Sequence, residues 1–331
     1  MSRHEQKPHE EVNIISGEMK SLGIKLLPPD LGLSKVDFTI EGSSIRYGLS
    51  SIKGISTKSL EGLEKFRESE KPNKFQIFRS AKAAGINIGV LSSLIQAGTL
   101  TEYKTHRPRL VLEAQAWNTL TEREKSNMEI IGKNHNYDLI DCIKECVEKN
   151  LLAEDGRPIF NKSRYETFKT KMEKYKQIYK QNSQYESFAN WYFETQLLGY
   201  SANLRLKEII GEGDYLDSSD LPYIEGFSKN KFIGTVVVSK KAKSRSSGND
   251  YILLELCDES GRLKAMLCDN KKFKKCTEFL ESGKPIPEKG DIVVVTGSKS
   301  KEDNTIFVDS IQTVSECIYI KLKDLPDEAE S

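Results

Sequence analysis

The sequence predicts an α+β protein of several domains, mostly helical over its N-terminal two-thirds and ending in a five-stranded β-barrel. Three observations favour this class. The chain has 331 residues, which is long enough for two or three domains. From Ser51 onward, short apolar-periodic segments alternate with glycine-containing turns, as in short packed helices. Beyond residue 230, apolar and polar residues alternate at a spacing of two, which is typical of strands.

The composition excludes several classes of protein. The chain is 30% charged and 37% hydrophobic, which is typical of a soluble protein with a real core. No stretch approaches the ~20 apolar residues of a membrane-spanning helix, and the first residues lack the apolar segment of a secretion signal. Six cysteines form no C-x-x-C pair, and only four histidines are present. We therefore expect reduced thiols, no metal site, no membrane partner and a cytoplasmic location.

The net charge of +1 conceals a local excess of cations. Between Glu225 and Cys276 the sequence holds 12 Lys and Arg residues against 6 Asp and Glu residues. Residues 321–331, in contrast, form an acidic tail. Such an uneven distribution predicts one basic surface rather than a uniformly basic protein.

Residues 1–50 predict a helix followed by a small sheet. Residues 9–22 have the periodicity of a short amphipathic helix, which ends at Gly23. Residues 36–40 and 44–49 then predict two short strands that form a hairpin around Gly42.

Residues 48–56, with the predicted helix Thr57–Arg67 after them, have the form of a helix-hairpin-helix, a DNA-binding motif. A glycine turn lets the backbone approach a phosphate, and the following helix offers free N–H groups and a positive dipole end. Ser56 is placed to cap that helix. The alternative is an ordinary turn, because glycine is common between helices. The residues expected to contact DNA here are Lys53, Gly54, Ile55, Ser56 and Lys58.

A second, weaker hairpin follows at residues 94–100, with Ala97, Gly98 and Thr99 as its candidate DNA contacts. The two glycine turns lie about forty residues apart. We therefore interpret residues 51–105 as a tandem helix-hairpin-helix that grips both strands of a duplex. Such backbone contacts fix position and carry little sequence information.

Residues 106–224 predict a helical connector, with one loop at residues 155–158 and a linker at residues 211–226. Aromatic and apolar residues recur there at steps of three and four, which places them on one face of a helix. Such a face is more often a packing stripe than a ladder that stacks on bases. Its members are Tyr165, Phe168, Met172, Tyr175 and Tyr179.

Residues 225–320 have the element order of an OB-fold, a small barrel that binds oligonucleotides, in which a helix stands between the third and fourth strands. The predicted strands are Phe232–Val238, Tyr251–Leu256, Leu263–Leu267, Asp291–Ser298 and Thr305–Asp309, and the helix is Asn270–Glu281.

The segment after the first of these strands is polar and basic, at the position where OB-folds commonly contact oligonucleotides. Tyr251 or Phe273 is placed to stack on a base, and one such stack contributes about 1–3 kcal/mol. The alternatives are that the aromatic residues fill the barrel, as we expect for Phe232, and that the cations form a solvated surface. The expected DNA contacts are Lys240, Lys241, Lys243, Arg245 and Tyr251.

These features together resemble the C-terminal half of the bacterial (C-family) DNA polymerase III alpha subunit. That family tends to read G-I-x-V-L-P-P-D-I-N-x-S, then F, then I-R-x-G-L-x-x-I-K-G-V-G. The resemblance implies that residues 1–50 end a fingers domain and that the tandem hairpins follow it. The matching residues are Gly23, Ile24, Leu27, Pro28, Pro29, Asp30, Ser34, Phe38, Ile45, Arg46, Gly48, Leu49, Ile52, Lys53 and Gly54.

The resemblance continues more weakly along the chain. Residues 94–100 are similar to the family's L-I-x-A-G-A-F-D, and residues 194–200 to its E-x-x-x-L-G-[FY] element. There are departures: Ser56 stands where these hairpins usually carry a second glycine, Thr101 stands where the family has aspartate, and the family's S-x-H-P is absent. A sliding-clamp peptide of the form Q-x-x-[LM]-x-[FL] is only partly matched by residues 115–120, so we favour a helix in which Trp117 packs inward.

The catalytic carboxylates of such a polymerase are absent from the sequence. Polymerases need carboxylates that hold two metal ions, and the family carries them in its palm as D-x-D, which occurs nowhere in these 331 residues. The resemblance therefore implies DNA binding without catalysis in this chain, with Mg²⁺ and the palm on a separate polymerase chain.

Two functions remain open at this point. The first is the DNA-holding part of a split replicative polymerase, in a bacterial or phage-infected cell, whose hairpins hold primer–template duplex and whose barrel holds single-stranded template. The second is a stand-alone DNA-binding accessory factor. Under the first, apolar residues of the N-terminal segment, such as Ile24, Leu26, Leu27 and Phe38, would be partly exposed in the isolated chain.

Overall fold

The computed structural model describes two units, Met1–Ala202 and Asn203–Ser331, and each is considered by itself. The predicted helix at 9–22 and the acidic tail lie almost entirely outside the described residues, as do the side chains of residues 174, 176–183 and 188. The described residues are Val12, Ile15, Met19 and the ranges 22–100, 105–183, 186–202, 204–210, 213–226, 228–245, 247–289, 291–301 and 303–313.

The first unit begins with a three-stranded sheet in the order β1-β3-β2. The predicted hairpin is confirmed: β2 (Thr39–Glu41) and β3 (Ser44–Arg46) pair antiparallel across Gly42, whose φ is +62°. β1 (Lys25–Leu27) pairs in parallel with β3 and was not predicted, because three residues carry no periodicity.

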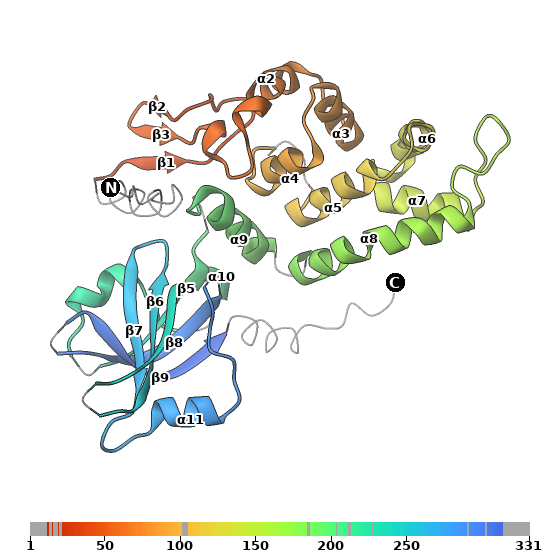
Figure 1. Cartoon of the computed structure of the whole chain (residues 1–331). Helices are drawn as coiled ribbons and strands as arrows, with labels where there is room; N and C mark the ends of the chain where they lie inside the picture. Colours follow the sequence, from red (N-terminus) through yellow and green to blue (C-terminus); the bar gives the residue numbers. More distant parts are fainter. Residues whose placement is uncertain are drawn as a thin grey trace. The chain divides into compact units, whose positions relative to one another are not determined.

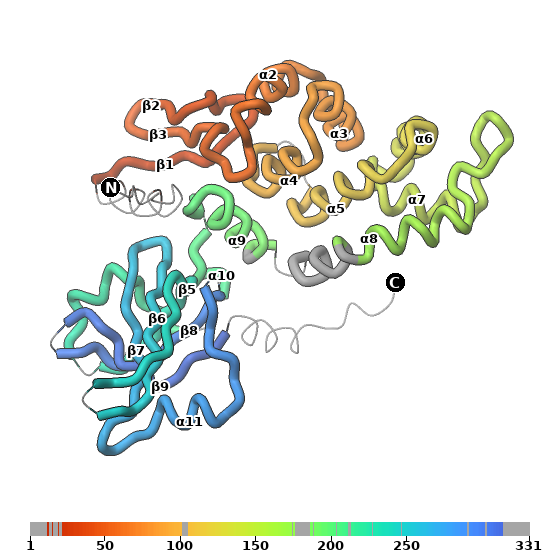
Figure 2. Tube along the Cα trace, viewed as in Figure 1, coloured from red at the N-terminus to blue at the C-terminus, as the bar shows by residue number. Residues whose placement is uncertain are grey.

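Short helices make up the rest of this unit (Figures 1 and 2). Side-chain caps begin several of them. Asn73 caps α3, Asn87 caps α4, and Thr121 forms a capping box with Glu124 at the start of α6. The elements are η1 (Leu49–Ser51), η2 (Thr57–Ser59), α2 (Leu60–Glu68), α3 (Lys74–Ala83), α4 (Ile88–Gln96), α5 (Arg107–Asn118), α6 (Glu122–Gly132), η3 (Lys133–His135), α7 (Leu139–Glu148), α8 (Lys162–Ser183) and α9 (Glu186–Leu198).

One continuous core joins the parts that the sequence suggested as three separate domains. Buried side chains from residue 31 to residue 200 belong to a single cluster. Trp117 is 4% exposed, and its ring centroid lies 5.0 Å from that of Phe75. Gln115 donates from Nε2 to the Ser92 hydroxyl at 3.0 Å. Residues 115–120 therefore form the end of a helix in which Trp117 packs inward, as favoured from the sequence, and these two side chains are not presented to a sliding clamp.

The aromatic stripe of α8 is confirmed as a packing face over its described residues. Phe168 and Met172 are each 4% exposed, and Tyr165 and Tyr175 pack half-buried against the same core. The side chain of Tyr179 lies outside the described set.

Two stacked tyrosines, whose hydroxyls donate to backbone carbonyls, join the small sheet to the end of α9. The Tyr47 hydroxyl donates to the carbonyl of Leu198 at 3.0 Å, and the rings of Tyr47 and Tyr200 stack with centroids 5.7 Å apart. The Tyr200 hydroxyl donates to the carbonyl of Leu27 at 3.3 Å. Burial raises the pKa of both tyrosines, so both stay protonated donors at neutral pH.

A buried charge network joins α3, α5 and α7. The Glu113 carboxylate is fully buried and lies 2.9 Å from Lys74 Nζ and 3.2 Å from Arg109 Nε. Arg109 also pairs with Asp138 at 2.6 Å. Burial raises the pKa of Glu113 to about 7, against the lowering effect of Lys74. A buried ion of this kind is costly unless every partner is present.

Replacing Glu113 should change the pH dependence of stability. Between pH 4.5 and about 7 the folded chain keeps a proton on Glu113 that the unfolded chain has released. The folded state then binds more protons, so the free energy of unfolding falls as pH rises, on the order of 1–3 kcal/mol in total. We expect the melting temperature of Glu113→Gln to change less with pH across this window than that of the wild-type chain. Glu148→Gln, at an exposed position of α7, is the control, and an unchanged slope in Glu113→Gln would contradict the assignment.

The second unit is a six-stranded sheet with a helix at one end (Figure 1). The order is β4-β5-β6-β7-β9-β8, and β8 pairs again with β5, while β7 and β9 run parallel. The elements are α10 (Leu206–Ile210), β4 (Tyr215–Leu216), η4 (Ser218–Tyr223), β5 (Lys229–Lys243), β6 (Asp250–Cys257), β7 (Arg262–Cys268), α11 (Lys275–Glu281), β8 (Ile292–Lys299) and β9 (Thr305–Thr313).

Three details differ from the sequence prediction. The sheet has six strands rather than five, because β4 pairs in parallel with the start of β5. β5 extends to Lys243, so residues 240–243 of the basic loop expected at 240–248, with three of its four cations, are strand paired with β6. The helix α11 begins at Lys275 rather than Asn270, because the Asp269 carboxylate accepts the backbone N–H groups of Cys276 and Thr277. The core is as predicted, and Phe232 is fully buried in it.

The predicted linker at 211–226 belongs to the second unit over its described residues. The backbone N–H of Ser218 donates to Asp258 Oδ2 at 2.7 Å, and Asp258 is itself buried. Lys299 Nζ donates to the carbonyl of Pro222 at 2.9 Å. The boundary therefore falls near residue 203 rather than at 225, because these contacts attach the segment to the sheet.

Candidate nucleic-acid interface

The first predicted hairpin forms an exposed glycine turn. Gly54 has a φ of +93°, a conformation that favours glycine. Ile52 is 1% exposed and anchors the turn in the core, while Ile55 is half-buried against it. Lys53 and Lys58 are exposed on either side of the turn. The turn and its two flanking lysines are thus exposed to solvent.

The segment on each side of this turn differs from two regular helices. The chain enters through the single 3₁₀ turn η1, and η2 precedes the α2 helix. Ser56 occupies the cap position of η2, as predicted, but its side chain makes no capping hydrogen bond. Its φ is −92°, so serine in place of the usual glycine costs no backbone strain here. The Ser56 side chain accepts no hydrogen bond from the first N–H groups of η2. N–H groups at the start of a helix are suited to bind an anion.

The second predicted hairpin is buried. Ala97 and Thr99 are 1% and 2% exposed, and the Thr99 hydroxyl donates to the carbonyl of Leu94 at 3.0 Å. Gly98 is also buried, with a φ of +78°, and the guanidinium of Arg107 occupies the space that a side chain would need. The glycine is thus required by the turn. The DNA contacts predicted for these three residues stay predictions, and their polar groups are already used inside the protein.

The end of α9 supports both turns. The backbone N–H of Lys53 donates to the carbonyl of Leu197 at 3.0 Å, which fixes the first hairpin. Glu194 accepts from Arg107 Nη1 at 2.8 Å, and Arg107 covers the second. Glu194 and Leu197 lie in the segment 194–200 that was matched only as a sequence element.

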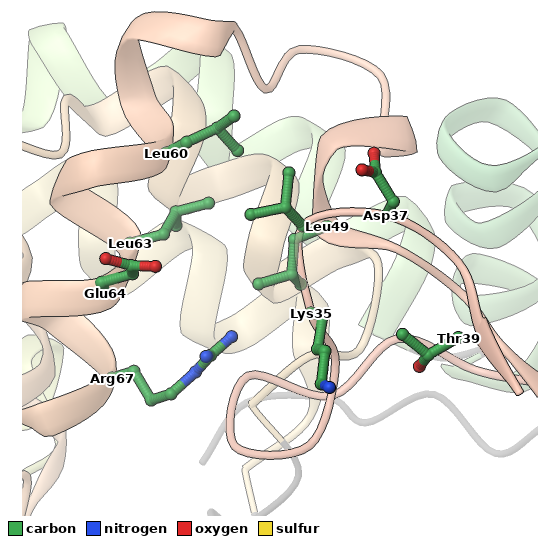
Figure 3. Close-up of a pocket in the computed structure, with 9 residues that line it drawn as sticks. Lys35, Asp37, Thr39, Leu49, Leu60, Leu63, Glu64 and Arg67 are labelled. Carbon is green, nitrogen blue, oxygen red and sulfur yellow. The ribbon is translucent and has the colours of Figure 1, made fainter. Parts of the chain in front are cut away.

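A groove of about 580 Å³ lies beside the first hairpin (Figure 3). Side chains of α2 face those of the segment before η1 across it. Arg67 is fixed at one side, because it donates from Nε to the carbonyl of Leu31 at 2.6 Å. Sequence reasoning missed this groove, since tertiary packing alone brings its walls together. The lining residues are Lys35, Val36, Asp37, Thr39, Leu49, Leu60, Leu63, Glu64 and Arg67.

In the second unit, alternate residues of β5, β6, β7 and β9 point away from the core and form what we call the outer face. The register places Val238 opposite Glu255, Lys240 opposite Leu253, and Leu253 opposite Met266. Met266 lies beside Phe307 of β9, which is 42% exposed. The outer face consists of Val238, Lys240, Tyr251, Leu253, Glu255, Lys264, Met266 and Phe307.

The predicted basic loop does not form one group of cations. Lys240 lies on the outer face, whereas Lys241 and Lys243 alternate to the opposite face of the ribbon, paired with Ile252 and Asp250. Lys241 Nζ lies 3.2 Å from Asp250 Oδ2. Arg245 is exposed in the turn between β5 and β6.

Tyr251 is half-buried on the outer face, and sequence reasoning missed Phe307, which lies two strands away on the same face beside Met266. The alternation of β9 was the available signal: Ile306 and Val308 are buried, which turns Phe307 outward.

The described residues offer little other chemistry. Burial raises the pKa of the Cys142, Cys146 and Cys257 thiols to about 12, so none is a reactive thiolate at neutral pH. Within the same residues no group of three or more His, Cys, Asp or Glu side chains is arranged to hold a metal ion. A search of the described helices finds none long and apolar enough to cross a membrane.

Comparison with known proteins identifies the class to which the first unit is similar. A family described as the helix-hairpin-helix motif matches residues 23–110. That range contains β1 to β3, both glycine turns and the start of α5.

Relatives of known function are DNA polymerase III alpha subunits. That of Buchnera aphidicola (subsp. Acyrthosiphon pisum) is 25% identical over 264 residues, 78% of this chain and 20% of the relative. Those of Bacillus subtilis and Aquifex aeolicus are 32% and 33% identical over 28% and 32% of this chain. The chain thus spans 8–20% of the length of these relatives. The resemblance to the C-terminal half of the DNA polymerase III alpha subunit is confirmed.

Solved structures overlay only loosely. The second OB-fold domain of replication protein A from Methanococcus maripaludis is 19% identical and covers 30% of this chain and 93% of its own, with a TM-score of 0.22. The mitochondrial single-stranded DNA binding protein Rim1 from S. cerevisiae is 11% identical and covers 27% and 96%, with the same TM-score.

Gly54→Ala should destabilise the first unit more than a positive φ alone explains. A Cβ at Gly54 would lie 2.7 Å from the Ser93 hydroxyl, whereas a Cβ at Gly85, whose φ is +80°, meets nothing within 4 Å. We expect Gly85→Ala to cost about 1 kcal/mol and Gly54→Ala about 1–3 kcal/mol more, measured by urea unfolding. Ser93→Ala combined with Gly54→Ala should recover part of the stability that Gly54→Ala loses. Equal losses of stability at the two glycines would contradict the close packing of Gly54 against Ser93.

Proposed function

We propose that the chain is the DNA-holding part of a replicative polymerase of the DNA polymerase III alpha type. The observation that carries the proposal is the exposed turn at Gly54 between Lys53 and Lys58, within the region that is similar to those alpha subunits. In this role the turn contacts the phosphates of the primer–template duplex and fixes its position without reading its sequence.

We further propose that the second unit is an OB-fold that holds single-stranded template on its outer face. The ladder order supports this: β5-β6-β7-β9-β8 returns to β5, and the helix α11 stands between β7 and β8. The outer face offers two cations, Lys240 and Lys264, and exposed apolar surface at Phe307. Single strands are bound by such combinations of cations and aromatic rings.

Catalysis, in this proposal, belongs to a separate polymerase chain that carries the palm and its Mg²⁺. The absence of D-x-D from the sequence supports this division. The N-terminal segment also presents apolar side chains to solvent: Ile40 is 82% exposed, Leu33 63% and Phe38 39%. Surfaces of this kind favour a protein partner.

The bacterial relatives support action in the cytoplasm of a bacterial or phage-infected cell. The alternative is a stand-alone accessory factor, which needs no such partner.

The isolated chain should bind primer–template DNA with strong salt dependence and incorporate no nucleotide when Mg²⁺ and nucleotides are supplied. Lys53→Glu with Lys58→Glu should weaken binding about tenfold near 0.1 M salt and reduce its salt dependence, because two lysines no longer neutralise phosphates. Lys133→Glu with Lys171→Glu, two exposed lysines outside the turn, is the control. DNA binding that is unchanged by the Lys53 and Lys58 substitutions would contradict the duplex contact. Nucleotide incorporation by the pure chain would contradict the absence of a catalytic site.

A tagged chain purified from its native host should carry with it a primer-extension activity. Ile40→Asp should lose that activity, because a charge at an apolar contact disrupts docking. Ile130→Asp, at a 63% exposed position on α6, should keep it. Recovery of the wild-type chain as a lone monomer without activity would instead support the accessory factor.

A further inference from the structure

The loop between β7 and α11 carries the densest cluster of cations in the described part of the second unit. Residues 270–275 read Asn-Lys-Lys-Phe-Lys-Lys, and we call them the lysine loop. Three of the four lysines are exposed, and Lys275 is half-buried. No ion pair among the described residues involves any of the four, whereas Lys229 and Lys241 do have carboxylate partners. The lysine loop therefore presents net positive charge, and the neighbouring Asp269 carboxylate, whose pKa Lys274 helps to lower, offsets only part of it.

The lysine loop also exposes an aromatic ring on a fixed backbone. Phe273 is 56% exposed. Its backbone is held because Asn270 Oδ1 accepts the N–H groups of Lys272 and Phe273, each at 2.8 Å. The Asp269 carboxylate then fixes the start of α11 at Cys276, which is fully buried. Burial of Cys276 anchors the loop, so Phe273 is exposed on a turn whose backbone is fixed.

The sheet register places the lysine loop near the end of the β5–β6 ribbon. Cys268, the last residue of β7, pairs with Tyr251, and Tyr251 pairs with Ala242. Ala242 and Cys268 flank Tyr251 in this row, so they are two strand spacings, about 10 Å, apart. The exposed cations Lys243 and Arg245 follow Ala242 directly, and the lysine loop follows Cys268. Figure 1 shows α11 across one end of the sheet. Tyr251 thus connects the outer face to this basic end.

We propose that the lysine loop is a second contact for single-stranded DNA, in which Phe273 stacks on a base and the flanking lysines bind the adjacent phosphates. A strand that passes Tyr251 on the outer face reaches this loop at the same end of the sheet. Lys275 Nζ lies over one face of the Phe273 ring, 5.6 Å from its centroid, so a base that stacks on the opposite face brings its phosphate near this cation. A single strand fits better than a duplex, because only an unpaired base is free to stack on a side chain. The inference rests on the proposed role of the outer face.

The test compares two oligonucleotides of the same composition on the full chain. One has about 8 nucleotides, enough for the outer face, and the other about 30, enough to continue past it. We expect Phe273→Ala to weaken binding of the long oligonucleotide about 5- to 100-fold, the loss of one stacked base, and to leave the short one unchanged. Phe307→Ala should weaken both. Tyr223→Ala, which removes an 88% exposed ring elsewhere in the unit, is the control.

Charge is tested separately. Lys271→Ala with Lys272→Ala should reduce the salt dependence for the long oligonucleotide by about 0.7 for each phosphate that is no longer neutralised, while Lys231→Ala at an exposed position of β5 should not. If neither oligonucleotide binds the wild-type chain, the proposed role of the outer face fails. If both bind and the lysine-loop variants match wild type, only the second contact is overturned. Loss of binding to anionic phosphatidylserine vesicles, with DNA binding intact, would assign the loop to a membrane surface instead.

Discussion

The geometry of the two glycine turns, at Gly54 and Gly98, depends on the last turn of α9. Tyr47 donates to the carbonyl of Leu198 and stacks on Tyr200 where β3 leads toward η1. A few residues earlier, Glu194 holds Arg107 over the glycine of the second hairpin. A buried hydrogen bond that loses one partner costs about 1–3 kcal/mol. Segments about 150 residues from the first hairpin in sequence are therefore a structural part of it.

This dependence explains why a short motif near residue 200 belongs with hairpins that end near residue 100. Taken alone, residues 194–200 form an ordinary helix end with a glycine after it. In the folded unit their carbonyls and carboxylate supply acceptors to Tyr47, Lys53 and Arg107. A DNA-contacting turn must keep its shape while charged phosphates approach, and acceptors on a packed helix provide that rigidity. The long helical segment between the two regions completes the core on which both rest.

Residue type and hydrophobic period predicted the features of the fold that depend on residues close together in the sequence. The turns at Gly42 and Gly54, the inward Trp117 and the strand order of the second unit follow from residue type and period. The rest depends on contacts between distant residues. β1 exists because it pairs with β3 about twenty residues later, and the segment around Ser218 joins the sheet because Asp258 accepts its N–H. The alternation of β9 indicates that Phe307 points outward, but only the pairing of β9 with β7 places it on the same face as Met266.

The two hairpins are unequal in the structure, and the second, whose sequence signal is also the weaker one, is the one that is buried. The second turn is buried, and its helix α4 carries Ser93, which packs against Gly54 of the first. We infer that the second hairpin mainly supports the first, since a glycine turn gains rigidity when a packed helix lies against it. In the proposed function, the first unit therefore contacts the duplex at one exposed turn. In the proposed function, the single-strand contacts of the second unit supply the remaining hold, through the cations at residues 240–245 and 271–275.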